Sequence, residues 1–137
     1  MKHHLHRFRV TFDLVDPGGR LFFAHLFTAA HRAYESLLAE AGLALGRLAE
    51  TGPLLPLVHA EADYLAPVGL EDEVEVQVNL EALGRSSFTL VHRFRLDDRP
   101  CARARTVHVA ISPDDGRPVP LPGFLIDALR PYGPEGN

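Results

Sequence analysis

A sharp turn with one carboxylate contains the residue types in this sequence that could do chemistry. The turn Asp16-Pro17-Gly18-Gly19 combines a proline, which fixes φ, with glycines that reach backbone conformations closed to other residues. An amphipathic stretch follows directly, so Asp16 would lie beside the free N–H groups and positive dipole of a helix start. Such a carboxylate could hydrolyse an acyl group, as general base or as nucleophile. A purely structural turn is the alternative.

Hydrophobic periodicity predicts the two elements that must position this turn. Phe8, Val10 and Phe12 alternate with polar residues, which predicts a half-buried strand over 6–13 before the turn. Apolar residues at helical spacing predict a helix over 24–41 after it, with Gly42 at the expected C-cap. A short helical turn is expected at 45–50, within an irregular connection.

Only strands are predicted after Pro56, followed by a Pro- and Gly-rich tail from Pro113. Alternating apolar and polar residues place these strands at 56–67, 74–80, 88–96 and 101–112. One long helix and these strands bury their apolar faces economically when an antiparallel sheet curls around the helix. The sequence therefore predicts an α+β fold in a single domain over residues 1–137, with open sheet edges that favour at least a dimer.

Composition limits the classes of function. The 14 Lys and Arg against 18 Asp and Glu give a net charge of −4, which offers no electrostatic case for binding nucleic acid. No stretch approaches the roughly 20 apolar residues of a membrane helix. The N-terminus lacks the apolar run of a signal peptide, and the single cysteine, Cys101, cannot form an internal disulfide. We therefore expect a cytoplasmic protein in which Cys101 contributes packing.

Several segments resemble one known family, in the same order along nearly the whole chain. They are Asp16–Gly19, Phe22–His25, Ala30–Glu35, Leu57–Tyr64 with Pro67, Gly84–Phe88 and Gly116–Pro120. Together they are similar to the hotdog-fold acyl-CoA thioesterases of the 4-hydroxybenzoyl-CoA thioesterase group. Within that group, the segments at Val58–Ala60 and His31–Glu35 look closest to the 1,4-dihydroxy-2-naphthoyl-CoA thioesterases of menaquinone and phylloquinone synthesis.

The resemblance implies a fold, an activity and an assembly. The fold is the hotdog, an antiparallel five-stranded sheet wrapped around one long central helix. The activity is hydrolysis of an acyl-CoA, expected to be aromatic, with Asp16 as the catalytic carboxylate. The family also implies a homotetramer built from dimers, active sites at subunit interfaces, and no cofactor or metal, since coenzyme A is part of the substrate. An aliphatic acyl-CoA thioesterase and a non-catalytic acyl-CoA-binding module remain as alternatives, beside a purely structural oligomerisation domain.

Further site residues are expected around the turn and in one hairpin. At three positions the sequence departs from the family: Arg20 replaces an apolar residue, Phe23 lacks the hydroxyl of a tyrosine, and His25 replaces asparagine. These changes affect the expected acyl specificity. The predicted hairpin at Arg85, Ser86 and Ser87 offers one cation and two hydroxyls, which could bind the phosphates of coenzyme A. A surface hairpin without a binding role explains the same residues equally well. The expected substrate-binding residues are Gly18, Gly19, Phe23, His25 and His59, and the expected CoA-binding residues are Arg85, Ser86 and Ser87.

Two polar clusters leave alternatives open. His31 and Glu35 are one helical turn apart and form either a solvated pair or a second acid–base group, as in hydratases on related frames. His59, Glu61 and Asp63 share one strand face, where a metal site is imaginable. A solvated or subunit-facing strand surface explains the same pattern, and the prediction is that no metal binds.

Overall fold

The computed structural model describes residues 1–43 and 45–134. Within these ranges, no helix is long and apolar enough to cross a membrane. The elements, in chain order, are β1 (His4–Arg9), a 3₁₀ turn (Phe12–Leu14), α1 (Phe23–Glu40), α2 (Leu45–Thr51), β2 (Leu57–Tyr64), β3 (Glu73–Leu83), β4 (Ser87–Leu96), β5 (Arg99–Val109), α3 (Gly123–Leu129) and a second 3₁₀ turn (Arg130–Tyr132).

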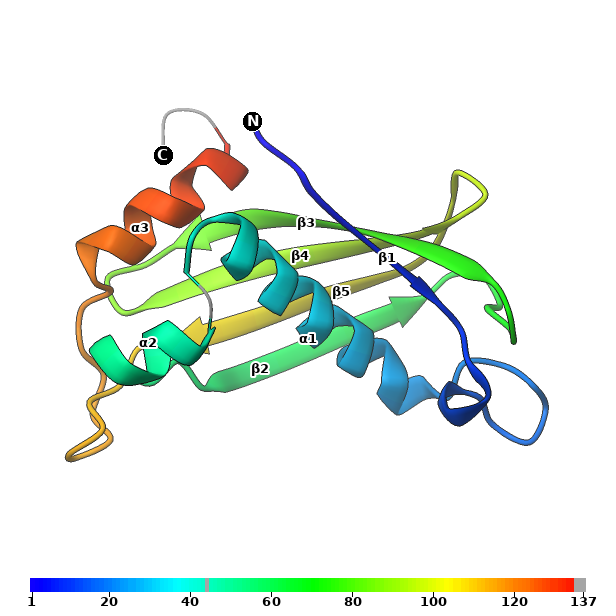
Figure 1. Ribbon diagram of the computed structural model, residues 1–137, viewed down its shortest axis with the longest axis horizontal. Coiled ribbons are helices and arrows are strands. Elements are labelled where there is room, and N and C mark those ends of the chain that lie inside the picture. Colours follow the sequence, from blue (N-terminus) through cyan, green and yellow to red (C-terminus); the bar gives the residue numbers. More distant parts are fainter. Residues whose placement is uncertain (44, 135–137) are drawn as a thin grey trace.

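The five strands form one antiparallel sheet in the order β1-β3-β4-β5-β2. The long helix α1 crosses one face of this sheet, as expected for a hotdog fold (Figure 1). The strands β1 and β2 are the two edges, so each has one row of backbone groups that no strand of this chain pairs with. Both ends of the described chain lie on the same side of the molecule, near α3 (Figure 1).

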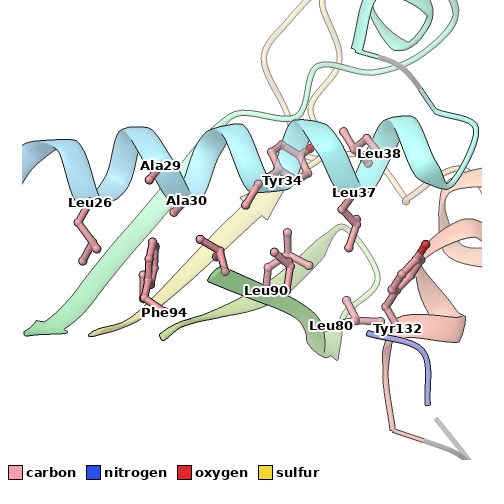
Figure 2. Packing of buried hydrophobic residues seen from close by; sticks show 14 of the residues in the cluster. Leu26, Ala29, Ala30, Tyr34, Leu37, Leu38, Leu80, Leu90, Phe94 and Tyr132 are labelled. Atoms are coloured by element: carbon pink, nitrogen blue, oxygen red, sulfur yellow. The ribbon is translucent and has the colours of Figure 1, made fainter. Parts of the chain in front are cut away.

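The core lies between α1 and the inner face of the sheet. Leu26, Ala30 and Leu37 on α1 are buried at helical spacing and face Leu90 and Phe94 of β4 (Figure 2). Small residues along the helix allow it to approach the strands closely, while the larger side chains fill the space at both ends. Each fully buried leucine or phenylalanine contributes about 1.5–3 kcal/mol, so this interface is the main source of stability.

The end of α1 shows why the sequence stops the helix where it does. Gly42 takes a φ of +82°, which favours glycine, and its N–H donates to the carbonyl of Ala39 at 3.1 Å. The N–H of Leu43 reaches back to the carbonyl of Leu38 at 2.7 Å, completing a Schellman motif. The predicted cap at Gly42 is confirmed, and the observed helix differs from the prediction by one residue at each end.

The first strand is shorter than predicted. β1 ends at Arg9 because the backbone of Val10 pairs instead with the loop before β3, accepting the N–H of Glu71 and donating to Asp72. The chain then turns into the 3₁₀ segment, which leaves Phe12 82% exposed. The prediction that Phe12 faces the core was therefore wrong.

The Pro- and Gly-rich tail contains a helix that the sequence reasoning did not predict. Leu121, just before α3, and Leu125 and Leu129 within it are buried at a spacing of four residues in the main hydrophobic core. Prolines on both sides of this short segment concealed its periodicity. The expectation that only strands follow Pro56 was wrong at this point.

Candidate active site

Backbone hydrogen bonds hold the turn that carries Asp16. The N–H of Asp16 donates to the carbonyl of Arg20 at 2.7 Å, and the N–H of Gly19 donates to the carbonyl of Asp16 at 2.9 Å. Gly19 takes a φ of +79°, a conformation that favours glycine. Its carbonyl accepts the N–H of Leu70 at 3.0 Å, which fixes the turn to the loop before β3.

The carboxylate of Asp16 has one bound oxygen and one open oxygen. Its Oδ1 accepts the N–H of Gly18 at 2.9 Å and the N–H of Arg20 at 3.1 Å. In the described part of the chain, no group hydrogen-bonds to Oδ2. A Cβ at position 18 would lie 3.3 Å from Oδ1, so the glycine leaves the room that the carboxylate needs. The backbone thus orients Asp16 and leaves an oxygen for water or an acyl carbon.

The start of α1 lies directly after this turn and has no side-chain cap. Its N-cap residue is Phe22, whose side chain cannot accept a hydrogen bond from the first turn. Among the described residues, the N–H groups of Phe23 and Ala24 have no backbone acceptor, whereas that of His25 donates to the Phe22 carbonyl at 2.9 Å. Free donors at the positive end of a helix dipole are suited to polarise a thioester carbonyl.

Phe23 and His25 lie in this first turn, as the sequence predicted. Phe23 is exposed, and its ring centroid lies 4.7 Å from that of Phe22. His25 is half-buried, with Nδ1 3.3 Å from the hydroxyl of Thr28 and its ring edge-on to Phe22. The structure brings both residues to the helix terminus next to Asp16, and their roles in binding substrate stay predictions.

Tyr64 belongs to this region although the sequence reasoning did not select it. From the end of β2, its hydroxyl donates to the carbonyl of Phe23, and burial raises the pKa of that hydroxyl above its ordinary value. Tyr64 also forms one wall of a cavity of about 320 Å³, together with Arg20, Leu26 and the buried Cys101. Its position at the end of the inner-facing residues of β2 was the only signal in the sequence.

His59 lies away from the turn within one chain. It faces the outer surface of the sheet, on the side opposite α1, and its Nε2 lies 3.2 Å from Glu61 Oε1. The hydrogen bond from His59, followed by that from Arg105 at 3.3 Å, holds the pKa of Glu61 below its usual range. The described residues contain no group of three or more His, Cys, Asp or Glu placed to hold a metal ion.

The predicted CoA-binding hairpin, between β3 and β4, lies at the opposite end of the sheet from the segment that joins β1 to α1 (Figure 1). It joins β3 to β4, and β3 starts beside the turn that carries Asp16 and runs away from it for 11 residues, about 35 Å. Arg85 is exposed, while its carbonyl accepts the N–H of Leu121 and that of Ser86 accepts the N–H of Ala110. Within one chain, Arg85, Ser86 and Ser87 do not reach the turn.

His31 and Glu35 do not form the pair that their spacing allows. Both are exposed on α1, and no hydrogen bond or ion pair joins them in the described structure. The ring of His31 instead meets that of Tyr34 at 5.9 Å between centroids. The geometry therefore gives no support to a second acid–base group at these positions.

Comparison with known proteins identifies the family to which the chain belongs. The family model of the thioesterase-like superfamily matches residues 10–129. A protein of Synechococcus elongatus named 1,4-dihydroxy-2-naphthoyl-CoA hydrolase is 34% identical over 123 residues, which cover 88% of this chain and 90% of the relative. A protein of the same name from Microcystis aeruginosa is 32% identical over 111 residues, covering 80% of each chain.

Solved structures show the same architecture. A 1,4-dihydroxy-2-naphthoyl-CoA thioesterase from Synechocystis superposes with a TM-score of 0.88 at 27% identity, covering 94% of this chain and 96% of its own. A gentisyl-coenzyme A thioesterase superposes with a TM-score of 0.82 at 25% identity, covering 92% of this chain and 98% of its own. The predicted hotdog fold and acyl-CoA thioester hydrolase activity are confirmed, and the chain belongs to the thioesterase-like superfamily.

Proposed function

We propose that this protein hydrolyses an aromatic acyl-CoA at the turn that carries Asp16, releasing the free acid and coenzyme A. The observation that carries the proposal is the carboxylate fixed by two backbone N–H groups beside an uncapped helix start. The relatives support an aromatic acyl group, because their names specify 1,4-dihydroxy-2-naphthoyl-CoA and gentisyl-CoA. Of these, 1,4-dihydroxy-2-naphthoyl-CoA is the substrate that we propose.

The geometry divides the chemical work between the helix and the carboxylate. The thioester carbonyl would accept hydrogen bonds from the free N–H groups at Phe23 and Ala24, which stabilise the negative charge that develops on its oxygen. The open Oδ2 of Asp16 would either take a proton from the attacking water or attack the acyl carbon itself. If Asp16 acts as a base, the water oxygen bonds to the acyl carbon, the C–S bond breaks, and the proton taken up by Asp16 passes to the leaving sulfur, which gives the free acid and the thiol of coenzyme A. If Asp16 acts as a nucleophile, the C–S bond breaks as a mixed anhydride with Asp16 forms, the thiolate takes a proton from solvent, and a second water hydrolyses the anhydride to the free acid and restores the carboxylate.

We further propose that two copies pair along the free edges of β2. Nearly all residues of this strand are exposed on both faces, and the apolar Leu57, Val58 and Leu65 are each more than half exposed. An unpaired strand edge with apolar residues favours association with another strand. Antiparallel pairing of the two edges would continue the sheet across both subunits.

This pairing also accounts for the distance between the Arg85–Ser87 hairpin and the turn within one chain. Antiparallel β2 edges place the far end of one sheet beside the catalytic end of the other. The hairpin at Arg85–Ser87 of one subunit would then approach the turn of its partner, where the CoA phosphates bind, whereas His59 stays on the outer face of the continued sheet. We propose that such dimers pair again to form the tetramer implied by the resemblance.

The test is thiol release from a panel of acyl-CoA esters. The panel contains the 1,4-dihydroxy-2-naphthoyl, 4-hydroxybenzoyl and benzoyl esters and a C6 to C12 aliphatic series. We expect the naphthoyl ester to react fastest, and Asp16→Asn to lower kcat by about 10²–10⁴-fold with little change in KM. Asp127→Asn is the matched control, because Asp127 is exposed on α3 and has no partner among the described residues.

Three results would contradict parts of this proposal. If an aliphatic ester is hydrolysed fastest, the preferred substrate is an aliphatic and not an aromatic acyl-CoA. Binding of coenzyme A without cleavage of any ester would indicate a non-catalytic module. Equal activity of wild type and Asp16→Asn would remove Asp16 from the mechanism.

A further inference from the structure

Four buried polar side chains that the hydrolysis does not use meet beneath the middle of α1. Tyr34 comes from α1 (Figure 2), His92 from β4, and Thr106 and His108 from β5. His92 and His108 are 0% and 4% exposed. All four line a cavity of about 30 Å³ between the helix and the sheet, with Phe27, Ala30, His31 and Leu57 as the other lining residues.

Three polar atoms at this cavity lack the partners that buried groups normally have. The Nε2 atoms of His92 and His108 lie 3.0 and 3.2 Å from the hydroxyl of Thr106. In the described structure, the Nδ1 atoms of both histidines and the hydroxyl of Tyr34 have no hydrogen-bond partner. A buried polar atom without a partner costs roughly 1–3 kcal/mol, so three around one cavity indicate a missing ligand.

The cluster is uncharged at neutral pH. Burial lowers the pKa of His92 to about 3 and that of His108 to about 4, and repulsion from His31 acts in the same direction. The backbone of Leu55 acts in the opposite direction and raises the pKa of His108 in part. Burial also raises the pKa of Tyr34 above its ordinary value, so its hydroxyl keeps its proton. An ion would therefore meet no compensating charge.

The hydrogens of the cluster define what the ligand must offer. The hydroxyl of Thr106 has one hydrogen, so at least one of the two imidazoles must donate its Nε2–H to Thr106. The Nδ1 atom of that imidazole carries no hydrogen, so it needs a hydrogen-bond donor as its partner. When Thr106 donates to the other imidazole, that ring carries its hydrogen on Nδ1 and needs an acceptor. A hydroxyl satisfies both requirements, whereas ammonium has no lone pair and a halide has no hydrogen.

We infer that this cavity is a binding site for one uncharged hydroxyl group, held by His92, His108 and Tyr34. Its volume of about 30 Å³ exceeds the roughly 10–15 Å³ needed for one water. The hydroxyl has two possible sources, a water molecule or a hydroxyl carried by the acyl group of the substrate. His31 lines the cavity and is exposed on α1, so a ligand can reach the cavity from solvent. Binding of a substrate hydroxyl rests on the proposed function, whereas binding of a water molecule does not.

The first test is the crystal structure of the substrate-free protein, together with ¹⁵N NMR of its histidines. We expect one ordered water within hydrogen-bond distance of both Nδ1 atoms and of the Tyr34 hydroxyl. The NMR spectra should show His92 and His108 uncharged at pH 7. An empty or collapsed cavity, a metal ion or a halide in it, or protonated imidazoles would overturn the inference whether or not the protein hydrolyses any ester.

The second test identifies the source of the hydroxyl. The ratio of kcat/KM for 4-hydroxybenzoyl-CoA to that for benzoyl-CoA is measured in wild type, Tyr34→Phe and Thr106→Val. Thr89→Val is the matched control, because Thr89 is also buried on β4 but lies on the outer face of the sheet. If the acyl hydroxyl binds, wild type prefers the hydroxylated ester at least tenfold, and the two cluster variants reduce this ratio while the control keeps it.

A different outcome assigns the site to water. An unchanged ratio in all variants, with the ordered water present in the crystal, supports the site with water as its ligand. An unchanged ratio with no water in the cavity overturns the inference. Failure of all esters to react would contradict the proposed function and leave the crystal and NMR test as the decisive one.

Discussion

Asp16 is oriented by the backbone of its own turn. In the described residues no cationic side chain contacts its carboxylate, and the two hydrogen bonds to Oδ1 come from N–H groups. Its negative charge is therefore not consumed by an ion pair and remains available to accept a proton or attack carbon. Small changes in the backbone of the turn should consequently affect the reaction as strongly as changes in the carboxylate.

Gly18→Ala tests this dependence on the backbone. A Cβ would lie 3.3 Å from Oδ1 and push the carboxylate out of line, so we expect kcat to fall roughly tenfold or more, since small misplacements of reacting groups are costly. The free energy of unfolding should change by less than about 1 kcal/mol, because the turn is exposed. Gly123→Ala is the control, since a Cβ there meets no atom within 4 Å. Unchanged kcat in Gly18→Ala would show that the carboxylate tolerates this crowding.

At the scale of elements, one glutamate connects three segments that are far apart in sequence. Glu40, the last residue of α1, accepts hydrogen bonds at one oxygen from the hydroxyl of Tyr132 and from His4 Nδ1, both at 2.7 Å. The hydrogen bond from Tyr132, followed by that from His4, holds the pKa of Glu40 below its usual range. His4 also contacts Ser36 through Nε2 at 2.9 Å. The end of α1 thereby anchors β1 and the C-terminal 3₁₀ turn.

Glu40→Ala should destabilise this junction. We expect the free energy of unfolding at pH 7 to fall by about 1–2 kcal/mol, the lower part of the range for hydrogen bonds to a charged group, because the side chain is 42% exposed. Glu35→Ala on the same helix is the control, since Glu35 is exposed and has no partner among the described residues. Urea unfolding of both variants measures the difference. Equal midpoints would show that the junction adds no stability.

At the scale of the whole molecule, the two edge strands of the sheet differ in how far the rest of the chain covers them. β1 has Leu5, Arg7 and Arg9 on its outer face and is joined to the rest of the chain near both of its ends, through Val10 and through Lys2, whose N–H donates to the Pro131 carbonyl. β2 exposes apolar side chains on an edge that no segment covers in the described structure. This difference makes β2 the edge that a second copy is expected to use.

Val58→Lys tests the use of the β2 edge. Val58 is 57% exposed, and a lysine at this position would place like charges across the proposed interface, so the assembly should dissociate toward monomers. Leu5→Lys is the control on the opposite edge, where Leu5 is 50% exposed. Sedimentation velocity should show loss of the oligomer in Val58→Lys alone. Dissociation by Leu5→Lys with an intact Val58→Lys assembly would assign the interface to β1.

Stability should depend on pH through the buried histidines. The pKa of His92 is lowered to about 3 and that of His108 to about 4, whereas both bind a proton near pH 6.5 when unfolded. Because the unfolded chain binds more protons below pH 6.5, the free energy of unfolding should be level above pH 7 and decrease as the pH falls toward 4. At pH 5 the loss should be about 2 kcal/mol for each histidine.

Urea unfolding at pH 7.5 and pH 5.0 measures this loss in wild type and in His92→Gln. The variant lacks one of the two titrating groups, so the difference between the two pH values should shrink by roughly half, whatever its stability at pH 7.5. The same difference in both proteins would show that other groups control acid stability.

The periodicity of the chain predicted most of the fold. The stripe on α1 and the alternation in β3, β4 and β5 follow from which side chains avoid water, and a cap glycine at Gly42 marks a local backbone requirement. The exposure of Phe12 and the existence of α3 were not predicted, because both depend on contacts with residues distant in sequence. The backbone of Val10 pairs with the loop before β3, and the leucines of α3 belong to the hydrophobic core that the sheet and α1 also form.

The sequence by itself determined the carboxylate turn, the helix that follows it and the family resemblance, because these depend on residues close together in the chain. Only the tertiary structure decided that Oδ1 of Asp16 is held and Oδ2 is open, and that Tyr64 reaches the carbonyl of Phe23. It also placed His59 on the outer face of the sheet and gathered His92 and His108 around a cavity. Such placements depend on strand order and register, which bring together residues that no local pattern connects.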